Sequence, residues 1–224
     1  EPRAGDDDET RSLRATLYGA LATAGDAEVT AFARRRVEAY LAEPATVDPA
    51  LAAMAFRVAP KRGDAALFDA IAGALANPVS SDAESQYLTA LPRFEDPALV
   101  ERALRFVDEG RLKLDEYPSY FASLIANPAA QPRAWRYLKE HWSELAPKVV
   151  SFGGRGAVPA LGAICTAELE AEVREFFAGH AAPGAERALA QALERIRHCL
   201  DFRAAQSGRF HAWLGAVSSA DRSR

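Results

Sequence analysis

Three breaks divide the first half of this chain into helical segments. They are Gly25-Asp26, Gly63-Asp64 and Phe94-Glu95-Asp96, and they lie about 30 to 40 residues apart. Glycine accepts the left-handed backbone that ends many helices, and aspartate caps the first amides of the next helix. Alanine and leucine fill the segments between the breaks, and no Asn-Gly or Asp-Gly turn occurs that could join two strands. The sequence therefore predicts helix hairpins and no convincing strand.

The first of these hairpins has one apolar face on each helix. On its first helix the face consists of Leu13, Leu17 and Leu21. On its second helix the apolar residues are Val29, Phe32, Val37, Tyr40 and Leu41. A single pair of this kind cannot bury both faces, so pairs stack on their neighbours. We therefore expect an all-α fold, a HEAT/armadillo-like array of antiparallel helix pairs that forms a curved α-solenoid.

Capping residues indicate where several helices begin. Asp48-Pro49 and Asp96-Pro97 each place a hydrogen-bond acceptor at the N-cap and proline at the first helical position. Ser81 and Glu84 have the spacing of a capping box. We expect helices to start at these three points.

A segment rich in tryptophan follows, from Gln131 to Leu145. Trp135, Leu138, Trp142 and Leu145 fall at i, i+3, i+7 and i+10, which is the spacing of a buried helix face. We expect one helix here, anchored in the core by its tryptophans, and we expect the third tryptophan of the chain, Trp213, to be core as well.

The stretch from Pro147 to Ile164 lacks a helical period and contains four glycines. Long irregular stretches in compact domains are usually functional or mobile. Arg155 lies alone among these glycines, where its guanidinium could reach a carboxylate; a flexible surface arginine is the alternative. After this link, one helix face contains Phe176 and Phe177. We expect one domain over residues 1–217, with hairpin repeats over 1–126, the tryptophan helix, link and closing helices over 127–217, and a polar tail over 218–224.

Composition excludes several classes of partner. The 224 residues are 49% hydrophobic and have a formal net charge of -4, so neither a nucleic acid nor an anionic membrane is an expected partner. No apolar run is long enough to span a bilayer. Cys165 and Cys199 are the only cysteines, too few for a disulfide framework or a four-cysteine zinc site, and we expect two reduced thiols rather than one disulfide.

No catalytic motif is present in the sequence. Zinc peptidases of the His-Glu-x-x-His type place two histidines one helical turn apart, and no pair of the four histidines here has that spacing. His141 and Glu144 lie at i and i+3, and we interpret them as solvated polar residues. Neighbouring His198 and Cys199 would diverge on a helix and cannot act as a pair. The run Arg34-Arg35-Arg36 is interpreted as a solvated helix face.

A set of short elements resembles a known family in their order along the chain. They are Ala134-Trp135, Trp142, Gly153-Gly154, Thr166 to Leu169, Phe176-Phe177, Leu193 to Ile196 and Trp213-Leu214. In this order they resemble the C-terminal helical domain of the gluzincin zinc aminopeptidases, the family of aminopeptidase N and the endoplasmic reticulum aminopeptidases.

The resemblance implies a role for this chain in a larger enzyme. In that family the domain arches over the catalytic cleft as a helical bowl, so the chain would control access of a peptide substrate to the catalytic domain of the same polypeptide. The parent would remove N-terminal amino acids with a zinc-bound water. No catalytic or metal-binding residue of the family can be carried over, so we expect no cofactor in this chain and zinc in the parent. Some relatives hold the carboxyl end of the substrate with basic residues of this domain, and Arg155 is the candidate for that role.

Two further expectations concern origin and class. Frequent alanine and the use of arginine over lysine favour a bacterial source, and we expect a soluble parent, cytoplasmic rather than periplasmic. The alternative function is a stand-alone α-solenoid scaffold that binds a protein or peptide partner.

Overall fold

The structure is a computed structural model that describes residues 5–150 and 156–221, with side chains to residue 217. It contains helices and no strand over these ranges, so the all-α prediction is confirmed. The α-helices are α1 (Asp8–Thr23), α2 (Ala27–Ala42), α3 (Pro49–Val58), α4 (Ala65–Ala76), α5 (Ser81–Ala90), α6 (Pro97–Asp108), α7 (Tyr117–Ala126), α8 (Gln131–Glu140), α9 (Trp142–Val149), α10 (Ala157–Ala160), α11 (Ala167–Gly179) and α12 (Glu186–Asp221). Short 3₁₀ helices are η1 (Pro44–Thr46), η2 (Ala59–Arg62), η3 (Leu91–Arg93) and η4 (Leu161–Ala163).

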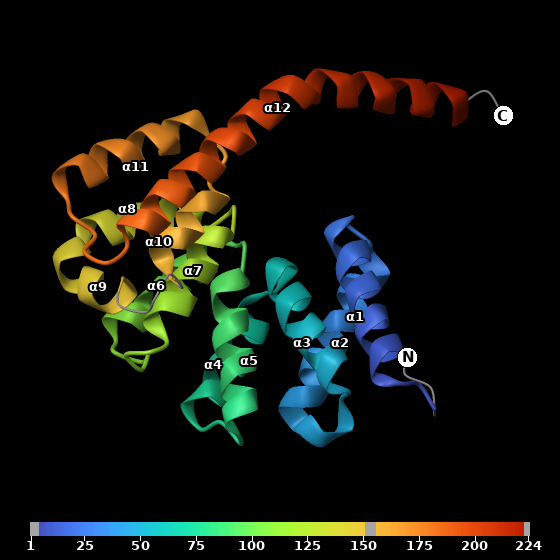
Figure 1. Ribbon diagram of the computed structural model, residues 1–224. Helices are drawn as coiled ribbons and strands as arrows, with labels where there is room; N and C mark the ends of the chain where they lie inside the picture. Colours follow the sequence, from blue (N-terminus) through green and yellow to red (C-terminus); the bar gives the residue numbers. More distant parts are fainter. Residues whose placement is uncertain (1–4, 151–155, 222–224) are drawn as a thin grey trace.

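The helices follow a curved path around an open hollow (Figure 1). Helices α1 to α5 stand side by side in one arm, and α6 to α11 gather at the other end of the curve. Each helix packs mainly on near neighbours in the sequence, such as α2 on α3, α4 on α5 and α7 on α8. Helix α12 packs on α10 and η4 and then extends freely above the hollow toward α1.

Aspartate side chains cap the helices at the predicted breaks. The carboxylates of Asp26, Asp64 and Asp96 accept hydrogen bonds from amides in the first turns of α2, α4 and α6. Asp48 does the same for α3. The start of α5 differs from the prediction, because the capping residue is Ser80 and not Ser81. Ser80 has the extended backbone of a cap, and its hydroxyl accepts from the Ala83 amide at 3.1 Å.

The first helix buries a different face from the one predicted. Leu13, Leu17 and Leu21 are 57%, 55% and 46% exposed, so the expected leucine face is not part of the core. Helix α1 instead turns Ala15 and Tyr18 inward, and the Tyr18 ring stacks on Phe32 of α2 with centroids 4.9 Å apart. The leucines lie on the opposite side of α1, which is exposed.

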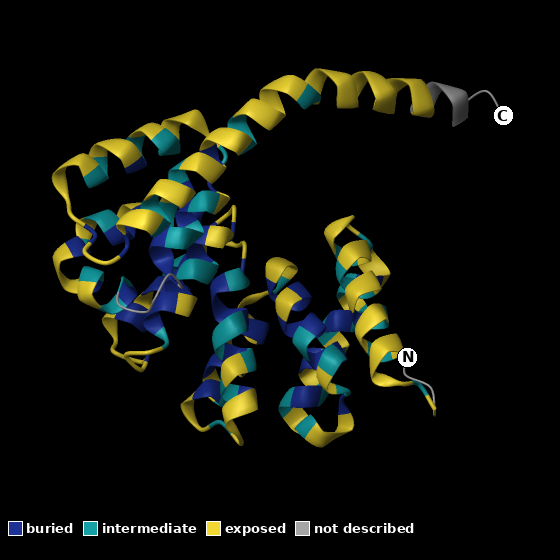
Figure 2. Cartoon of the chain, in the orientation of Figure 1, coloured by how far each residue is buried: buried dark blue, intermediate teal, exposed yellow. Residues whose placement is uncertain are grey.

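Buried residues follow the inner sides of the helices and merge into one core (Figure 2). The predicted tryptophan helix is broken at His141 into α8 and α9, and α9 contains Pro147. The break does not separate the aromatic residues. Trp135 and Trp142 both contact the rings of Phe176 and Phe177 on α11, at centroid distances between 5.3 and 6.2 Å. Trp135 is completely buried.

Helix α12 continues through Leu214 to Asp221. One expectation at this end of the chain is wrong. Trp213 is 58% exposed on this helix and is not a core residue of the chain. It contacts Phe210 one helical turn earlier, with stacked rings 6.0 Å apart.

The irregular link is shorter than predicted. Residues 147–149 belong to α9, and residues 157–163 form α10 and η4. Val158, Leu161 and Ile164 recur every three residues and are completely buried. The glycines around these residues conceal the short apolar period in the sequence. In the structure, the three side chains let the segment pack between α7 and α12.

The two cysteines form a disulfide, so the expectation of reduced thiols is wrong. Cys165 follows η4, and Cys199 lies midway along α12. Their Cα atoms are 5.6 Å apart, within the range that a disulfide bridges. A separation of 34 residues in the sequence gave no sign of this contact, because it depends on how α12 crosses η4.

Candidate functional site

The residues that the sequence offered as candidates for binding or catalysis, Arg155 and the histidines, do not form one site in the described part of the chain. Arg155 lies outside the described residues. The Nδ1 atoms of His141 and His180 lie 3.0 and 2.9 Å from backbone carbonyls one turn earlier in the chain, and both rings stack on aromatic neighbours. His198 and His211 are exposed on α12. Over the described ranges, no group of three or more His, Cys, Asp and Glu is placed to hold a metal ion.

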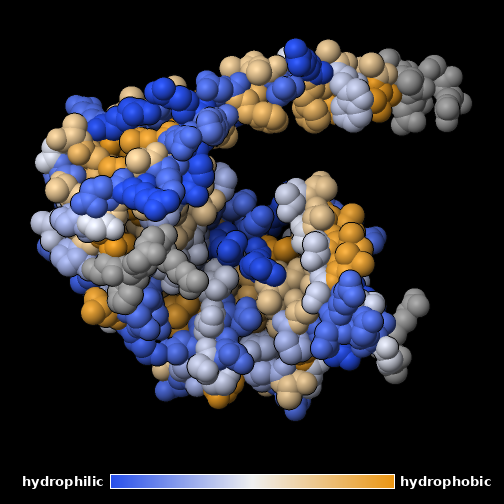
Figure 3. Space-filling model, in the orientation of Figure 1, coloured by the Kyte–Doolittle hydropathy of each residue, from blue (hydrophilic) through white to orange (hydrophobic). Residues whose placement is uncertain are grey.

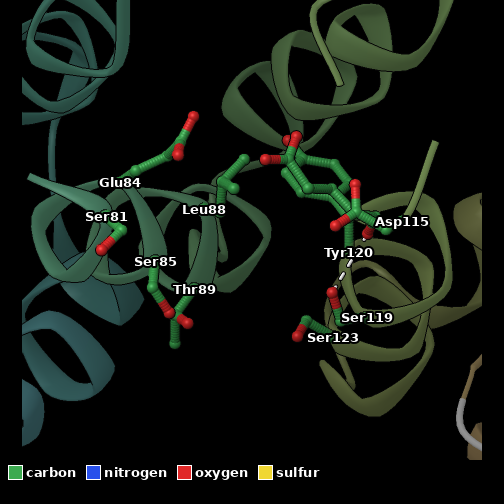
Figure 4. Close-up of a pocket in the computed structure, with 10 residues that line it drawn as sticks. Ser81, Glu84, Ser85, Leu88, Thr89, Asp115, Ser119, Tyr120 and Ser123 are labelled. Atoms are coloured by element: carbon green, nitrogen blue, oxygen red, sulfur yellow. Dashed lines mark hydrogen bonds between the residues drawn. The ribbon is translucent and has the colours of Figure 1, made fainter. Parts of the chain in front are cut away.

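A polar cavity of about 280 Å³ lies between α5 and α7. Figure 4 shows hydroxyl side chains facing it from both helices, Ser85 and Thr89 from α5 and Ser119 and Ser123 from α7. Each hydroxyl can donate one hydrogen bond and accept two. Tyr120 also lines the cavity, but its hydroxyl donates to the Ala103 carbonyl at 2.9 Å. The hydroxyls of Ser85, Thr89 and Ser123 therefore suit a ligand with alternating donors and acceptors, such as a peptide backbone.

Carboxylates at the same cavity are already engaged with a lysine. Lys113 Nζ donates to Glu84 and lies 3.6 Å from a carboxylate oxygen of Glu116. The hydrogen bond to Glu84 is the main reason why the pKa of Lys113 is raised. The Ser119 hydroxyl donates to the Glu116 carbonyl at 3.1 Å, which fixes the turn before α7. Asp115 also lines this end, so the cavity favours a neutral or cationic group here.

A second cavity of about 490 Å³ neighbours the first, and Ser123 lines both. It is bounded by Lys61 of η2, Arg93 of η3, the end of α7 and Ala160 of α10. Glu95 is its acidic lining residue and is exposed. We call the two cavities together the α5–α7 groove, with an acidic end at Glu84 and a basic end at Arg93.

Arg93 determines the electrostatics of the basic end. Its Nε donates to the Thr89 carbonyl at 3.1 Å, while the rest of the guanidinium lies along the cavity wall. Burial lowers the pKa of Arg93, and the positive charge of nearby Arg57 lowers it further. Within the described part of the chain, neither Arg93, Arg57 nor Lys61 forms an ion pair. A partly buried cation that repels its neighbour gains from an anionic ligand.

The wall of the basic end is held by a buried amide. Asn127 Nδ2 donates to the Pro92 and Phe94 carbonyls at 3.1 and 2.9 Å, on either side of Arg93. Its Oδ1 accepts from the Ala129 amide at 3.1 Å. Asn127 therefore ties the η3 turn to the end of α7 and fixes the backbone that carries Arg93.

The basic end faces the hollow of the molecule. Lys61 and Arg93 belong to the turns that follow α3 and α5, at the ends of these helices nearest α12 (Figure 1). In the space-filling view, strongly hydrophilic side chains gather in the hollow at this level (Figure 3). The turns that carry Lys61 and Arg93 therefore lie beside the hollow.

The sequence did not indicate the basic residues of the groove, Lys61 and Arg93. It singled out Arg155 and the run Arg34-Arg35-Arg36 instead. Arg57 and Lys61 lie four residues apart, whereas Arg93 lies more than 30 residues later in the chain. Lys61 and Arg93 each follow a proline in a 3₁₀ turn. The run at Arg34 behaves as predicted for a solvated face. Arg34 pairs with Glu38 and with Asp64, both at 2.9 Å, and is neutralised there.

The sequence of this chain is similar to a known domain family and to several aminopeptidases. Residues 1–198 match the model of the family described as the ERAP1-like C-terminal domain. The alanine/arginine aminopeptidase of Saccharomyces cerevisiae is 29% identical over 204 residues, and aminopeptidase 2, mitochondrial, of the same yeast is 26% identical over 200 residues. Aminopeptidase M1-B of Oryza sativa subsp. japonica is 32% identical over 137 residues, or 58% of this chain and 15% of the rice protein.

The matched regions cover most of this chain but a small part of each relative. They include 86% and 88% of the chain and only 23% and 21% of the two yeast proteins. The chain therefore spans less than a quarter of the length of these relatives. They are yeast and plant proteins, and the bacterial source remains a prediction.

Proposed function

Because this chain belongs to the ERAP1-like C-terminal domain family, we propose that it caps the catalytic cleft of a zinc aminopeptidase and controls which peptides enter. In this proposal the parent removes N-terminal amino acids and holds zinc in its catalytic domain. The partners of the chain are that catalytic domain, in the same polypeptide, and the peptide substrate. The observation that carries the proposal is the basic end of the α5–α7 groove, which Lys61 and Arg93 line.

The groove suits the carboxyl end of a peptide. A peptide held at its amino end in a catalytic domain across the hollow extends by about 3.3 Å per residue, so its other end reaches this domain. Its terminal carboxylate would accept hydrogen bonds from Arg93 and balance the charge of Lys61 and Arg57. Hydroxyls such as Ser123 would bond to the peptide backbone. Arg155 stays a prediction as a further contact.

The test compares free-acid and amidated peptides with the full-length protein that contains this chain. In the Arg93→Ala variant, kcat/KM should fall about tenfold for peptides with a free carboxyl end, since a charged hydrogen bond contributes about 1.5 to 3 kcal/mol. Peptides with an amidated end should lose little. The matched control is Arg187→Ala, because Arg187 is exposed at the start of α12 and away from the groove.

The contrast between the two peptide types decides the outcome. A loss confined to free-acid peptides supports carboxylate binding at the basic end. Equal losses for both peptide types, or no loss with either, would contradict it. A loss of the same size in Arg187→Ala would show a general effect of surface charge rather than a site.

A further inference from the structure

A further cavity, of about 350 Å³, lies between η1 with the start of α3 on one side and the start of α5 on the other. We call it the η1–α5 cavity. The turns that precede α3 and α5 lie at the end of the arm away from α12 (Figure 1). Lys61 and Arg93 follow the opposite ends of these two helices, so this cavity is separate from the basic end of the groove. Ser85 lines both this cavity and the acidic end of the groove.

Tyr40 brings a hydroxyl without a partner to the η1–α5 cavity. The residue is only 8% exposed, and its ring packs edge to face against Phe56 and Tyr87, with centroids 5.2 and 6.4 Å apart. In the described part of the chain no residue forms a hydrogen bond with its hydroxyl, which is also not among the wholly buried polar atoms. The polar tip of this otherwise buried side chain is therefore open to the cavity.

Two polar side chains of α5, Asp82 and Gln86, line the same cavity. Asp82 is exposed, and no cation of the described residues pairs with it. Burial raises the pKa of Tyr40, and the negative charge of Asp82 raises it further, so the carboxylate lies near the ring. Another carboxylate at this end of the arm, Asp48, is engaged, since it caps α3 and lies 3.8 Å from Arg11. Asp82 therefore gives the cavity a negative charge that the described residues do not balance.

The lining of the cavity matches a primary ammonium group on an alkyl stem. The Asp82 carboxylate, the Tyr40 hydroxyl oxygen and the Gln86 amide oxygen can each accept a hydrogen bond, and a primary ammonium has three donors on one nitrogen. Apolar residues complete the wall beside these three acceptors, as the stem of such a group requires. They include Pro44, Val47 and Ala52. Among the described residues that line the cavity, none is a lysine or arginine that would repel a cation.

We propose that the η1–α5 cavity binds a primary ammonium group, with Asp82 as its counter-ion and Tyr40 and Gln86 as further hydrogen-bond acceptors. Two sources carry this group on an alkyl stem, a lysine side chain and a small free amine, and the experiment separates them. The inference does not rest on the proposed function, because none of these three residues belongs to the basic end of the groove.

Saturation-transfer NMR on the full-length protein tests the proposal, with pentylamine as the probe. We expect Asp82→Asn to raise the Kd of pentylamine at least about tenfold, because it removes the charge of the counter-ion. Tyr40→Phe keeps the ring in the core and removes only the hydroxyl, so it should raise the Kd about threefold. The matched control is Asp201→Asn, since Asp201 is exposed on α12, and it should leave the Kd unchanged.

Two analogues of pentylamine test which part of the probe is recognised. 1-Pentanol has the same stem without the charge and should bind at least about tenfold more weakly. Pentyltrimethylammonium keeps the charge but has no N–H donor, so it should also bind more weakly than pentylamine. An amine bound elsewhere in the full-length protein is not affected by Asp82→Asn, so only binding that this substitution weakens is assigned to the cavity.

Nα-acetyl-lysine amide separates the two sources. Binding of this compound that Asp82→Asn weakens would assign the cavity to lysine side chains, whereas such binding by pentylamine alone would assign it to free amines. The same Kd of pentylamine in the wild-type and Asp82→Asn proteins would overturn the proposal, as would the absence of binding, equal binding of 1-pentanol, or an equal loss in Asp201→Asn. These results do not depend on aminopeptidase activity, so failure of the proposed function would appear separately, in the peptide test at Arg93.

Discussion

At the scale of residues, the candidate site depends on side chains whose roles are set by contacts distant in sequence. No local pattern in the sequence marks Arg93. In the structure, burial and the positive charge of Arg57 both disfavour the charged guanidinium, and both lower its pKa. Asn127 lies in the short link between α7 and α8. Its amide in fact spans 33 and 35 residues to hold the turn of Arg93. A local pattern contains no sign of such contacts, so the groove could not be predicted.

Replacing Asn127 tests this support. Asn127→Ala leaves the Pro92 and Phe94 carbonyls without their donor in a buried place, and each unsatisfied group costs about 1 to 3 kcal/mol. We expect the free energy of unfolding in urea to fall by about 2 to 4 kcal/mol. Asn77→Ala, at the exposed end of α4, should change it by less than about 0.5 kcal/mol. Equal effects of the two substitutions would contradict the bracing role of Asn127.

At the scale of elements, capping chemistry was the most reliable guide. Aspartate followed by proline, or preceded by glycine, marked the starts of α2, α3, α4 and α6 correctly because a cap is decided within four residues. Which face of a helix is buried was less predictable. The leucines of α1 and Trp213 of α12 have core spacing yet are exposed, because burial requires a second element that the pattern does not specify.

The cap of α4 gives a pH-dependent contribution to stability. The hydrogen bond from Arg34 is the largest cause that lowers the pKa of Asp64 below its ordinary value of 3.8, and the Leu67 amide adds to it. A lowered pKa in the folded state means that the contribution is complete above the ordinary value and is lost as the pH falls through the folded value. The destabilisation by Asp64→Asn should therefore be clear at about pH 6 and shrink below about pH 3.5 in urea unfolding. If the difference in unfolding free energy between the wild-type chain and Asp64→Asn grows as the pH falls, Asp64 does not make this contribution.

The disulfide sets how firmly the inner half of α12 is attached. Closing a loop of 34 residues stabilises a fold by about 3 to 4 kcal/mol in the chain-entropy account. Dithiothreitol should lower the melting temperature of the wild-type chain and leave the double variant Cys165→Ser and Cys199→Ser unchanged. A similar response of both proteins to reductant would mean that the effect does not come from this bond.

At the scale of the whole molecule, the order of short motifs was more informative than any one of them. The match over residues 1–198 confirms the resemblance to the aminopeptidase N family that this order indicated. The same order could not show that α12 projects across the hollow, or that Lys61 and Arg93, from two separate turns, line one cavity. These features depend on how successive helices rotate along the array. The domain limits and the role of Arg155 remain predictions.

The central claim is that this chain is the non-catalytic, access-controlling domain of an aminopeptidase. The most direct measurement is the release of N-terminal amino acids from one peptide by the full-length protein and by the isolated 224-residue chain, with zinc present in both assays. We predict turnover by the full-length protein and none by the isolated chain. Turnover that follows the isolated chain through further purification would contradict the claim, as would a full-length protein without the activity, which would favour a stand-alone scaffold.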